Sequence, residues 1–244
     1  MLLPALAKAK AAGQSVSCIN NLKQLQMGYL IYVSDNSDSL PPNSARSVAL
    51  GNVANLPGSW VVGNAARDTN TANIEAGVIY GSVGSASVYH CPADKSTVVS
   101  NAALPRTRSY SLDGWLNCSY TANGFDWVPQ TYPWEQLKLS TMHRPTPSGV
   151  FGFIDQHEQS IDAGIFIIEQ PGWVASDLTQ DDWGSLAADR HRQGCNLSLL
   201  DGHVEHWRWQ APKVYKGFYA PAAPGADLAD HRRLQECLPH DAVR

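Results

Sequence analysis

The stretch Cys18–Tyr32, with the sequence CINNLKQLQMGYLIY, decides how the first part of the chain folds. Its apolar residues recur every three or four positions, which places them on one stripe of an α-helix. Alanines upstream have high helix propensity, so the predicted helix covers residues 5–33. The polar segment Asp35–Asp38, followed by Pro41 and Pro42, ends this helix.

One face of the predicted helix is expected to pack on a core and the other to face solvent. An amphipathic helix owes most of its stability to the packing of its apolar stripe. Lys23 and Gln26 are polar, and we expect both side chains to be exposed. The stripe that we expect to be buried consists of Cys18, Leu22, Leu25, Tyr29 and Tyr32.

The next strong signal is Asn196–Trp207, with the sequence NLSLLDGHVEHW. Two β-favouring runs flank the dipeptide Asp201-Gly202, which predicts a hairpin with a two-residue type I′ turn. In that register Leu199 faces Val204 across the two strands.

Shorter elements are predicted around the helix and the hairpin. Residues 150–154 and 165–168 are apolar runs joined by a polar connection, and they predict two strands. Residues 41–150 are rich in Gly, Pro, Asn and Ser, which indicates a long irregular insertion with short packed segments and one strand at 108–112. After a linker rich in Pro, Ala and Gly, residues 227–238 predict a short helix.

These elements together predict an α+β fold, in which the N-terminal helix packs on an antiparallel sheet that carries the insertion. We expect three parts: residues 1–34 form the helix, residues 35–210 form the globular domain, and residues 211–244 form the linker and the C-terminal helix.

Composition excludes several classes of protein. The 244 residues are 43% hydrophobic and 16% charged, which gives enough apolar content for a core and excludes a disordered chain. The net charge of −4 argues against a dedicated nucleic-acid-binding protein, because such proteins usually have a basic excess. No apolar run reaches the ~18 residues of a membrane-spanning helix.

No motif of a common enzyme class is present. The chain has no Gly-x-Ser-x-Gly, no phosphate-binding loop and no Gly-x-Gly-x-x-Gly, and its five cysteines form no Cys-x-x-Cys. We therefore expect a protein without catalytic residues. A metal-dependent hydrolase stays open as an alternative, and its sign would be a bound metal with an open coordination position.

Carboxylates and histidines in the second half of the chain are candidate metal ligands. Asp155 and His157 follow one apolar run, while Asp201 and His203 flank the predicted turn of the hairpin. If the two hairpins are neighbours, these four side chains and His191 share one polar cluster, and carboxylate and imidazole groups can bind zinc or manganese. The alternative, which we favour, is structural: the Asp-Gly pair serves the turn and the histidines hydrogen-bond to the backbone.

Distance restricts this cluster. Nine residues separate His191 from Asp201, so a fully extended chain would hold them ~33 Å apart at ~3.3 Å per residue. One straight strand therefore cannot bring these two side chains together, and the chain before Asn196 would have to fold back.

The eight tryptophans fall into two groups. Trp60, Trp115 and Trp207 lie in apolar runs, and we expect their rings in the core. Trp127 and Trp134 flank prolines in a loop, which makes them the surface candidates. Exposed tryptophan rings can stack on sugars, so a sugar-binding module is a second alternative function.

Several segments, in this order, resemble one known family. They are LLPALAKAK at 2–10, CINNLKQL at 18–25, VYHCPAD at 88–94, RSYS at 108–111 and DQHEQSI at 155–161. In addition, His191 and Asp201-Gly202 stand as an H-x9-DG motif. The chain is similar to bacterial type IV pilin-like proteins, and more narrowly to the type II secretion pseudopilin-like group that has this motif near the C-terminus.

The resemblance implies a pilin-like fold and a structural function. The protein would be a subunit of a type II secretion or type IV pilus-like assembly in the bacterial cell envelope, on the periplasmic side of the inner membrane or in an extracellular fibre. Its partners would be other pilin-like subunits and secretion-assembly proteins. Members of this family begin with a leader and a membrane-spanning apolar stretch, whereas this sequence begins inside the helix. We therefore expect an N-terminally truncated member, whose membrane contact runs through the missing segment.

The resemblance also bears on disulfides and metals. Exported proteins enter an oxidising compartment, where disulfides persist. Cys18 lies on the packed stripe and Cys91 opens a Cys-Pro turn that can dock on it, so we predict a Cys18–Cys91 disulfide, with two buried thiols as the alternative. We expect no cofactor. Calcium is an alternative because major pseudopilins bind it near the C-terminus; here the oxygens of Asp177, Thr179 and residues 181–182 are candidates.

Overall fold

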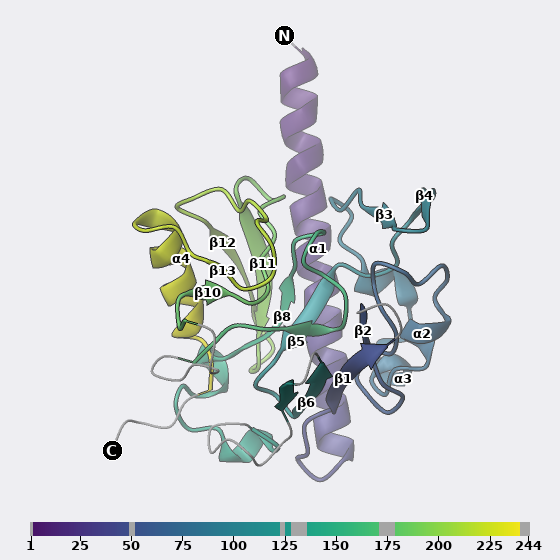
Figure 1. Ribbon diagram of the computed structural model, residues 1–244. Helices are drawn as coiled ribbons and strands as arrows, with labels where there is room; N and C mark the ends of the chain where they lie inside the picture. The colour runs from purple at the N-terminus through teal and green to yellow at the C-terminus, as the bar shows by residue number, and fades with distance from the viewer. Residues whose placement is uncertain (1, 49–51, 123–124, 128–135, 171–178, 240–244) are drawn as a thin grey trace.

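The computed structural model describes residues 2–48, 52–122, 125–127, 136–170 and 179–239. The fold is α+β, with one long helix, α1 (Leu2–Asp35), and several sheets (Figure 1). The N-terminal turns of α1 stand clear of the globular body, and the rest of the helix runs alongside the sheets (Figure 1). No helix within the described residues is both long enough and apolar enough to cross a membrane.

The predicted helix and most of its buried stripe are confirmed. Leu22, Leu25 and Tyr29 are fully buried, as is Cys18, because this stripe packs on the central sheet. Tyr32 is only partly buried, and Val33 closes the apolar stripe near the end of the helix.

Lys23 is exposed as expected, but the prediction for Gln26 is wrong, because its side chain is fully buried. The Gln26 Oε1 accepts a hydrogen bond from Ser198 Oγ at 2.8 Å. A strand of the sheet therefore supplies a polar partner that takes the place of water at this position of the helix.

The central sheet has five strands in the order β12-β11-β8-β5-β9, and α1 packs on its β12, β11 and β8. Their bounds are β5 (Tyr110–Asp113), β8 (Phe151–Asp155), β9 (Ile165–Phe166), β11 (Gly194–Leu199) and β12 (Val204–Arg208). The predicted strands in 150–154 and 165–168 both form, but β5 lies between them. Since β5 and β9 are parallel, the sheet is mixed rather than antiparallel. The segment 41–150 is therefore more than an insertion, because it supplies the strand β5 to the central sheet.

The hairpin at Asp201-Gly202 exists, but its predicted register is wrong by one residue. Ser198 pairs with Val204, and the Leu199 N–H donates a hydrogen bond to the His203 carbonyl at 2.8 Å. The loop therefore has three residues, with Gly202 at a φ of 99°. Leu200, the first residue of this loop, is fully buried.

A second sheet has the order β2-β1-β6-β7, and two small sheets pair β3 with β4 and β10 with β13. These strands are β1 (Asn43–Val48), β2 (Asn52–Asn55), β3 (Thr97–Val98), β4 (Asn101–Pro105), β6 (Cys118–Ala122), β7 (Phe125–Trp127), β10 (Asp182–Trp183) and β13 (Ala220–Pro221). The shorter helices are α2 (Ala72–Glu75), α3 (Tyr80–Val83), η2 (Ala86–Tyr89), η3 (Leu139–Thr141), η4 (Pro147–Gly149) and α4 (Ala226–Gln235).

The tryptophans expected in the core are there. Trp60 and Trp115 are fully buried and Trp207 is 5% exposed. The side chains of Trp127 and Trp134, the surface candidates, lie outside the described residues. The helix α4 packs through Leu234 into a core that also contains Trp115 and Trp207.

Candidate metal centre

Four side chains from distant parts of the sequence meet inside the protein, where α1 first enters the body. Their possible ligand atoms, two thiol sulfurs, one imidazole nitrogen and one carboxylate oxygen, all lie within 4.8 Å of one another. The four residues are Cys18, Cys91, Asp155 and His191, and each is at most 2% exposed.

Each residue comes from a different element. Cys18 is on the packed face of α1, Cys91 follows η2, and Asp155 ends β8. The Cys91 N–H donates a hydrogen bond to Ser109 Oγ at 3.1 Å, which fixes the Cys-Pro turn against the segment that leads into β5.

A tight turn before β11 places His191. Arg192 and Gln193 both adopt left-handed φ values, 55° and 56°, and the His191 N–H donates to the Gly194 carbonyl at 3.1 Å. The chain therefore folds back before Asn196. It brings His191 to Asp155, and not to the Asp201 end of the strand.

The distances within the cluster are short. His191 Nε2 lies 3.2 Å from Cys91 Sγ and 3.5 Å from Asp155 Oδ2. Cys18 Sγ lies 4.0 Å from the same Asp155 Oδ2. Both Cys91 and Asp155 thus face one ring nitrogen of His191, so the groups converge on a common point.

This convergence differs from the relay of a Cys-His-Asp catalytic triad. In a triad the nucleophile contacts one imidazole nitrogen and the carboxylate contacts the other. Here Cys91 Sγ and Asp155 Oδ2 both lie beside Nε2 of His191. The arrangement therefore matches a ligand set better than a proton relay.

A buried arginine supports the carboxylate of the cluster. Arg190 Nη1 donates to Asp155 Oδ1 at 2.6 Å and lies 3.5 Å from Asp94, while Nη2 lies 3.0 Å from Glu158. Burial lowers the pKa of Arg190, but Asp155 and Asp94 outweigh it, so the net shift is upward. Arg190 therefore stays charged and occupies one oxygen of Asp155, which leaves Oδ2 toward the cluster.

Protonation in the cluster responds to these contacts. Burial lowers the pKa of His191, but Asp155 and Cys91 outweigh it and raise this pKa to about 9. The pKa of Cys91 is raised by its hydrogen bond with Cys18 and by burial. Tyr110 Oη donates a hydrogen bond to Cys18 Sγ at 3.2 Å. These shifts favour a protonated His191 imidazole and a neutral Cys91 thiol.

No family model, curated protein or solved structure matches this chain.

The structure divides the metal ligands predicted from sequence into two groups. Asp155 and His191 meet, but Asp201 and His203 lie at the opposite end of β11, on the exposed turn to β12. There His203 Nδ1 contacts Asp201 Oδ1 at 2.5 Å. The prediction that all five side chains share one cluster is wrong, because the full length of β11 separates the two ends of the H-x9-DG motif.

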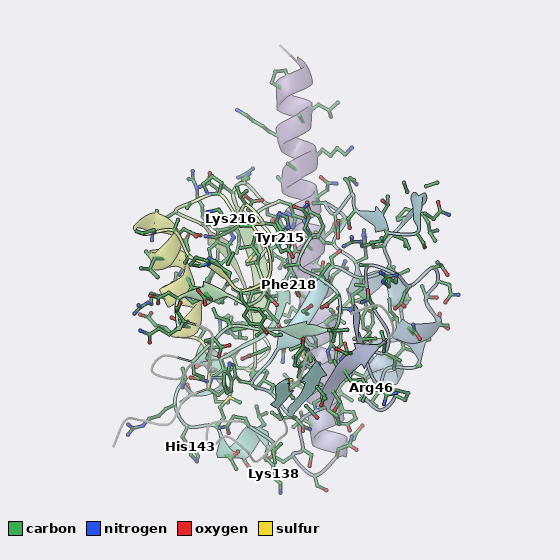
Figure 2. The ribbon with its side chains drawn as sticks, in the orientation of Figure 1. Arg46, Lys138, His143, Tyr215, Lys216 and Phe218 are labelled. Atoms are coloured by element: carbon green, nitrogen blue, oxygen red, sulfur yellow. The ribbon has the colours of Figure 1, made fainter. Side chains whose placement is uncertain are left out.

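His157 takes a third position. Its ring stacks on Tyr215 with centroids 6.2 Å apart, in the surface region labelled in Figure 2. Burial is the main reason that its pKa is lowered, which favours the neutral imidazole. His157 lies beside Glu158, which pairs with Arg190, and it supplies no atom to the four-residue cluster.

The two cysteines of the predicted disulfide lie in the cluster, as separate thiols. Sequence reasoning did not count them as metal ligands. Two signals pointed to them: Cys18 lies on the packed stripe, and Cys91 opens a Cys-Pro turn.

The acidic loop considered for calcium is engaged within the protein. Asp182 accepts hydrogen bonds from the Thr179 N–H at 2.7 Å and from Thr179 Oγ1 at 2.8 Å. Asp181 pairs with Arg232 at 2.7 Å. Asp177, the remaining candidate ligand, lies outside the described residues.

Proposed function

We propose that this chain is a structural, pilin-like subunit of a type II secretion or type IV pilus-like assembly in the bacterial envelope. The observation that carries the proposal is the shape of α1. Residues 4–11 are exposed on all sides, while the helix from Cys18 onward packs on the globular body (Figure 1). One helix thus serves both as core element and as a projecting rod.

Among the described residues, nothing packs against the projecting turns, and residues 4–11 are all exposed. In Figure 2 their side chains extend from the helix without a neighbouring segment. Leu6, in these turns, is 68% exposed, and Val16, just beyond them, is 57% exposed. Because helices in water owe most of their stability to tertiary packing, this part of α1 fits a role in which neighbouring subunits cover it.

The sequence supports the same partners. The segment order around CINNLKQL, HCPAD and the H-x9-DG motif resembles pseudopilin-like proteins, which assemble with other pilin-like subunits. The net charge of −4 gives no reason to add a nucleic-acid partner. The proposed partners are therefore other pilin-like subunits and the assembly proteins of the envelope.

The two alternative functions have less support. A hydrolytic metal needs an open coordination position, but the four cluster residues are buried and none lines the pocket of about 160 Å³ beside Trp183 and Tyr215. A sugar-binding surface needs exposed rings, and the tryptophans whose side chains the structure describes are at most 5% exposed.

Cysteine cross-linking in cells tests the proposal. The gene is expressed with its natural upstream region. Leu6→Cys places a thiol on the projecting part of α1, and Val16→Cys places one on the exposed face of the helix beside the body. We expect mild oxidation to give covalent dimers and larger species from these variants. Arg232→Cys, on the exposed face of α4, is the matched control and should stay monomeric.

Two results would overturn the proposal. One is a monomer from both helix variants at normal expression. The other is a coding region upstream of codon 1 that lacks an in-frame leader and apolar stretch.

A further inference from the structure

We propose that Cys18, Cys91, Asp155 and His191 bind one structural Zn²⁺ ion. This site is independent of the proposed assembly role, since it lies inside a single chain. It would join four segments: α1, the turn after η2, the end of β8 and the turn before β11.

The spacing of the four groups matches the edges of a zinc tetrahedron. Zinc lies ~2.3 Å from thiolate sulfur and ~2.0–2.2 Å from imidazole nitrogen and carboxylate oxygen, so neighbouring ligand atoms are about 3.3–3.8 Å apart. The separations involving His191 Nε2 are 3.2 Å to Cys91 and 3.5 Å to Asp155. The Cys18–Asp155 separation is 4.0 Å. All four ligand atoms lie within 4.8 Å of one another, so the pairs that are furthest apart would have to approach by at most about 1 Å to complete the tetrahedron.

The donor set selects the metal. Two thiolates with an imidazole and a carboxylate are soft and borderline ligands, which favour zinc over the oxygen-seeking calcium and magnesium. All four protein positions are filled and buried, as in structural zinc sites, which keep no position for water.

Neighbouring groups already orient two of the ligands. Arg190 holds Asp155 Oδ1 at 2.6 Å, so Oδ2 is the oxygen directed at the cluster. Tyr110 Oη donates to Cys18 Sγ at 3.2 Å. Hydrogen bonds of this kind fix ligand orientation and spread the charge of the thiolate and carboxylate in metal sites.

A disulfide accounts for less of this geometry. A Cys18–Cys91 bond would use the two sulfurs alone, and it would give Asp155 and His191 no reason to converge on the same point. Zinc accounts for all four groups.

The position of the site gives zinc a mechanical role. Gln14 Nε2 donates to the Pro92 carbonyl at 2.8 Å, which ties the helix to the body just beyond its exposed turns, and Cys18 lies one turn further on. Pro92 directly follows Cys91. The ion would therefore fasten the projecting helix to the body at the point where the two meet.

Metal content and cobalt spectroscopy on the full 244-residue chain test the proposal. The protein is purified under reducing conditions, given equimolar zinc, and dialysed. We expect about one zinc per chain to be retained. Replacement by Co²⁺ should give a thiolate-to-cobalt charge-transfer band and the intense visible bands of tetrahedral coordination.

Variants assign the site. Cys91→Ser and Asp155→Asn should each weaken zinc retention at least tenfold, as measured by competition with a chromogenic chelator. Cys195→Ser removes a fully buried cysteine that is outside the cluster, so it should keep wild-type zinc retention.

Three results would overturn the zinc proposal. The first is a folded wild-type protein that retains neither zinc nor tetrahedral cobalt. This result does not depend on whether any variant folds. Cys195→Ser could lose as much zinc as Cys91→Ser. Peptide mapping could find a Cys18–Cys91 disulfide and no metal in protein taken from an oxidising compartment. Each of these results leaves the cross-linking test of the assembly role unaffected.

Discussion

Ser198 Oγ donates a hydrogen bond to Gln26 Oε1 over 2.8 Å in the interior of the protein, between the middle of α1 and strand β11 of the central sheet. Both side chains are fully buried. Gly152, on the neighbouring strand β8, leaves the space that Gln26 occupies, because a Cβ at this glycine would collide with Gln26 Oε1. A polar contact thus fixes how the helix sits on the sheet.

This contact predicts a coupled effect of two substitutions. Gly152→Ala should lower the free energy of unfolding by about 1–3 kcal/mol, because the new methyl group overpacks the site against Gln26. Combining it with Gln26→Ala should cost less than the sum of the two single changes, since the shortened side chain makes room. Urea unfolding of the wild type, both single variants and the double variant measures this coupling. Additive losses would show that Gly152 and Gln26 do not compete for space.

Periodicity predicted the buried stripe on α1, and the same periodicity places Gln26 on the buried face. It stands four residues after Leu22 and three before Tyr29, which puts it on the same face. Its polarity argued for exposure, but the sheet supplied Ser198 as a partner. Sequence periodicity therefore gives the face of a residue, while the partner that makes burial tolerable comes from a strand far along the chain.

Contacts between segments that lie far apart in the sequence were the second feature that the sequence could not fully predict. The apolar runs that became β8 and β9 were visible, but nothing local showed that β5 would lie between them. At the candidate metal centre, Cys18 and Cys91 could be paired from the sequence. The meeting of His191 with Asp155 was part of the predicted cluster, but the turn that produces it was not predicted, because it depends on left-handed backbone at Arg192 and Gln193, which are not glycines.

The buried face of α1 also gives a direct stability prediction. Leu25 is fully buried, so Leu25→Ala should lower the free energy of unfolding by about 2–5 kcal/mol through lost burial and a cavity. Met27 on the same helix is 46% exposed, and Met27→Ala should cost less than about 0.5 kcal/mol. Chemical denaturation followed by tryptophan fluorescence compares the two. Equal losses from the two variants would mean that the wrong face of the helix has been assigned to the core.

Lys213 is predicted to fasten α4 to the rest of the fold. Its Nζ lies 2.8 Å from both Asp227 and Asp230, and 5.1 Å from the ring centres of Trp183 and Trp209. Lys213→Ala should cost about 3–5 kcal/mol, because it leaves the buried Asp230 carboxylate without its cation.

The matched control for Lys213 is the exposed Lys216, labelled in Figure 2, whose replacement by alanine should change stability by less than about 0.5 kcal/mol. Thermal and urea unfolding of both variants measure the difference. A Lys213→Ala variant as stable as Lys216→Ala would contradict the role assigned to this ion pair.

Glu169 should make the stability of the protein fall as the pH rises through neutrality. It is 3% exposed, and burial, followed by the charge of Asp182, raises its pKa from 4.5 to about 7. The unfolded chain releases this proton near pH 4.5, whereas the folded protein holds it until about pH 7. The contribution of neutral Glu169 is therefore fully present below pH 4.5 and is lost as the pH rises through 7, a change of about 3 kcal/mol.

Glu169→Gln should remove this loss, so urea unfolding should show the variant gaining on the wild type between about pH 4 and about pH 8. Parallel curves for the wild type and Glu169→Gln would mean that this carboxyl ionises equally readily in the folded and unfolded chains.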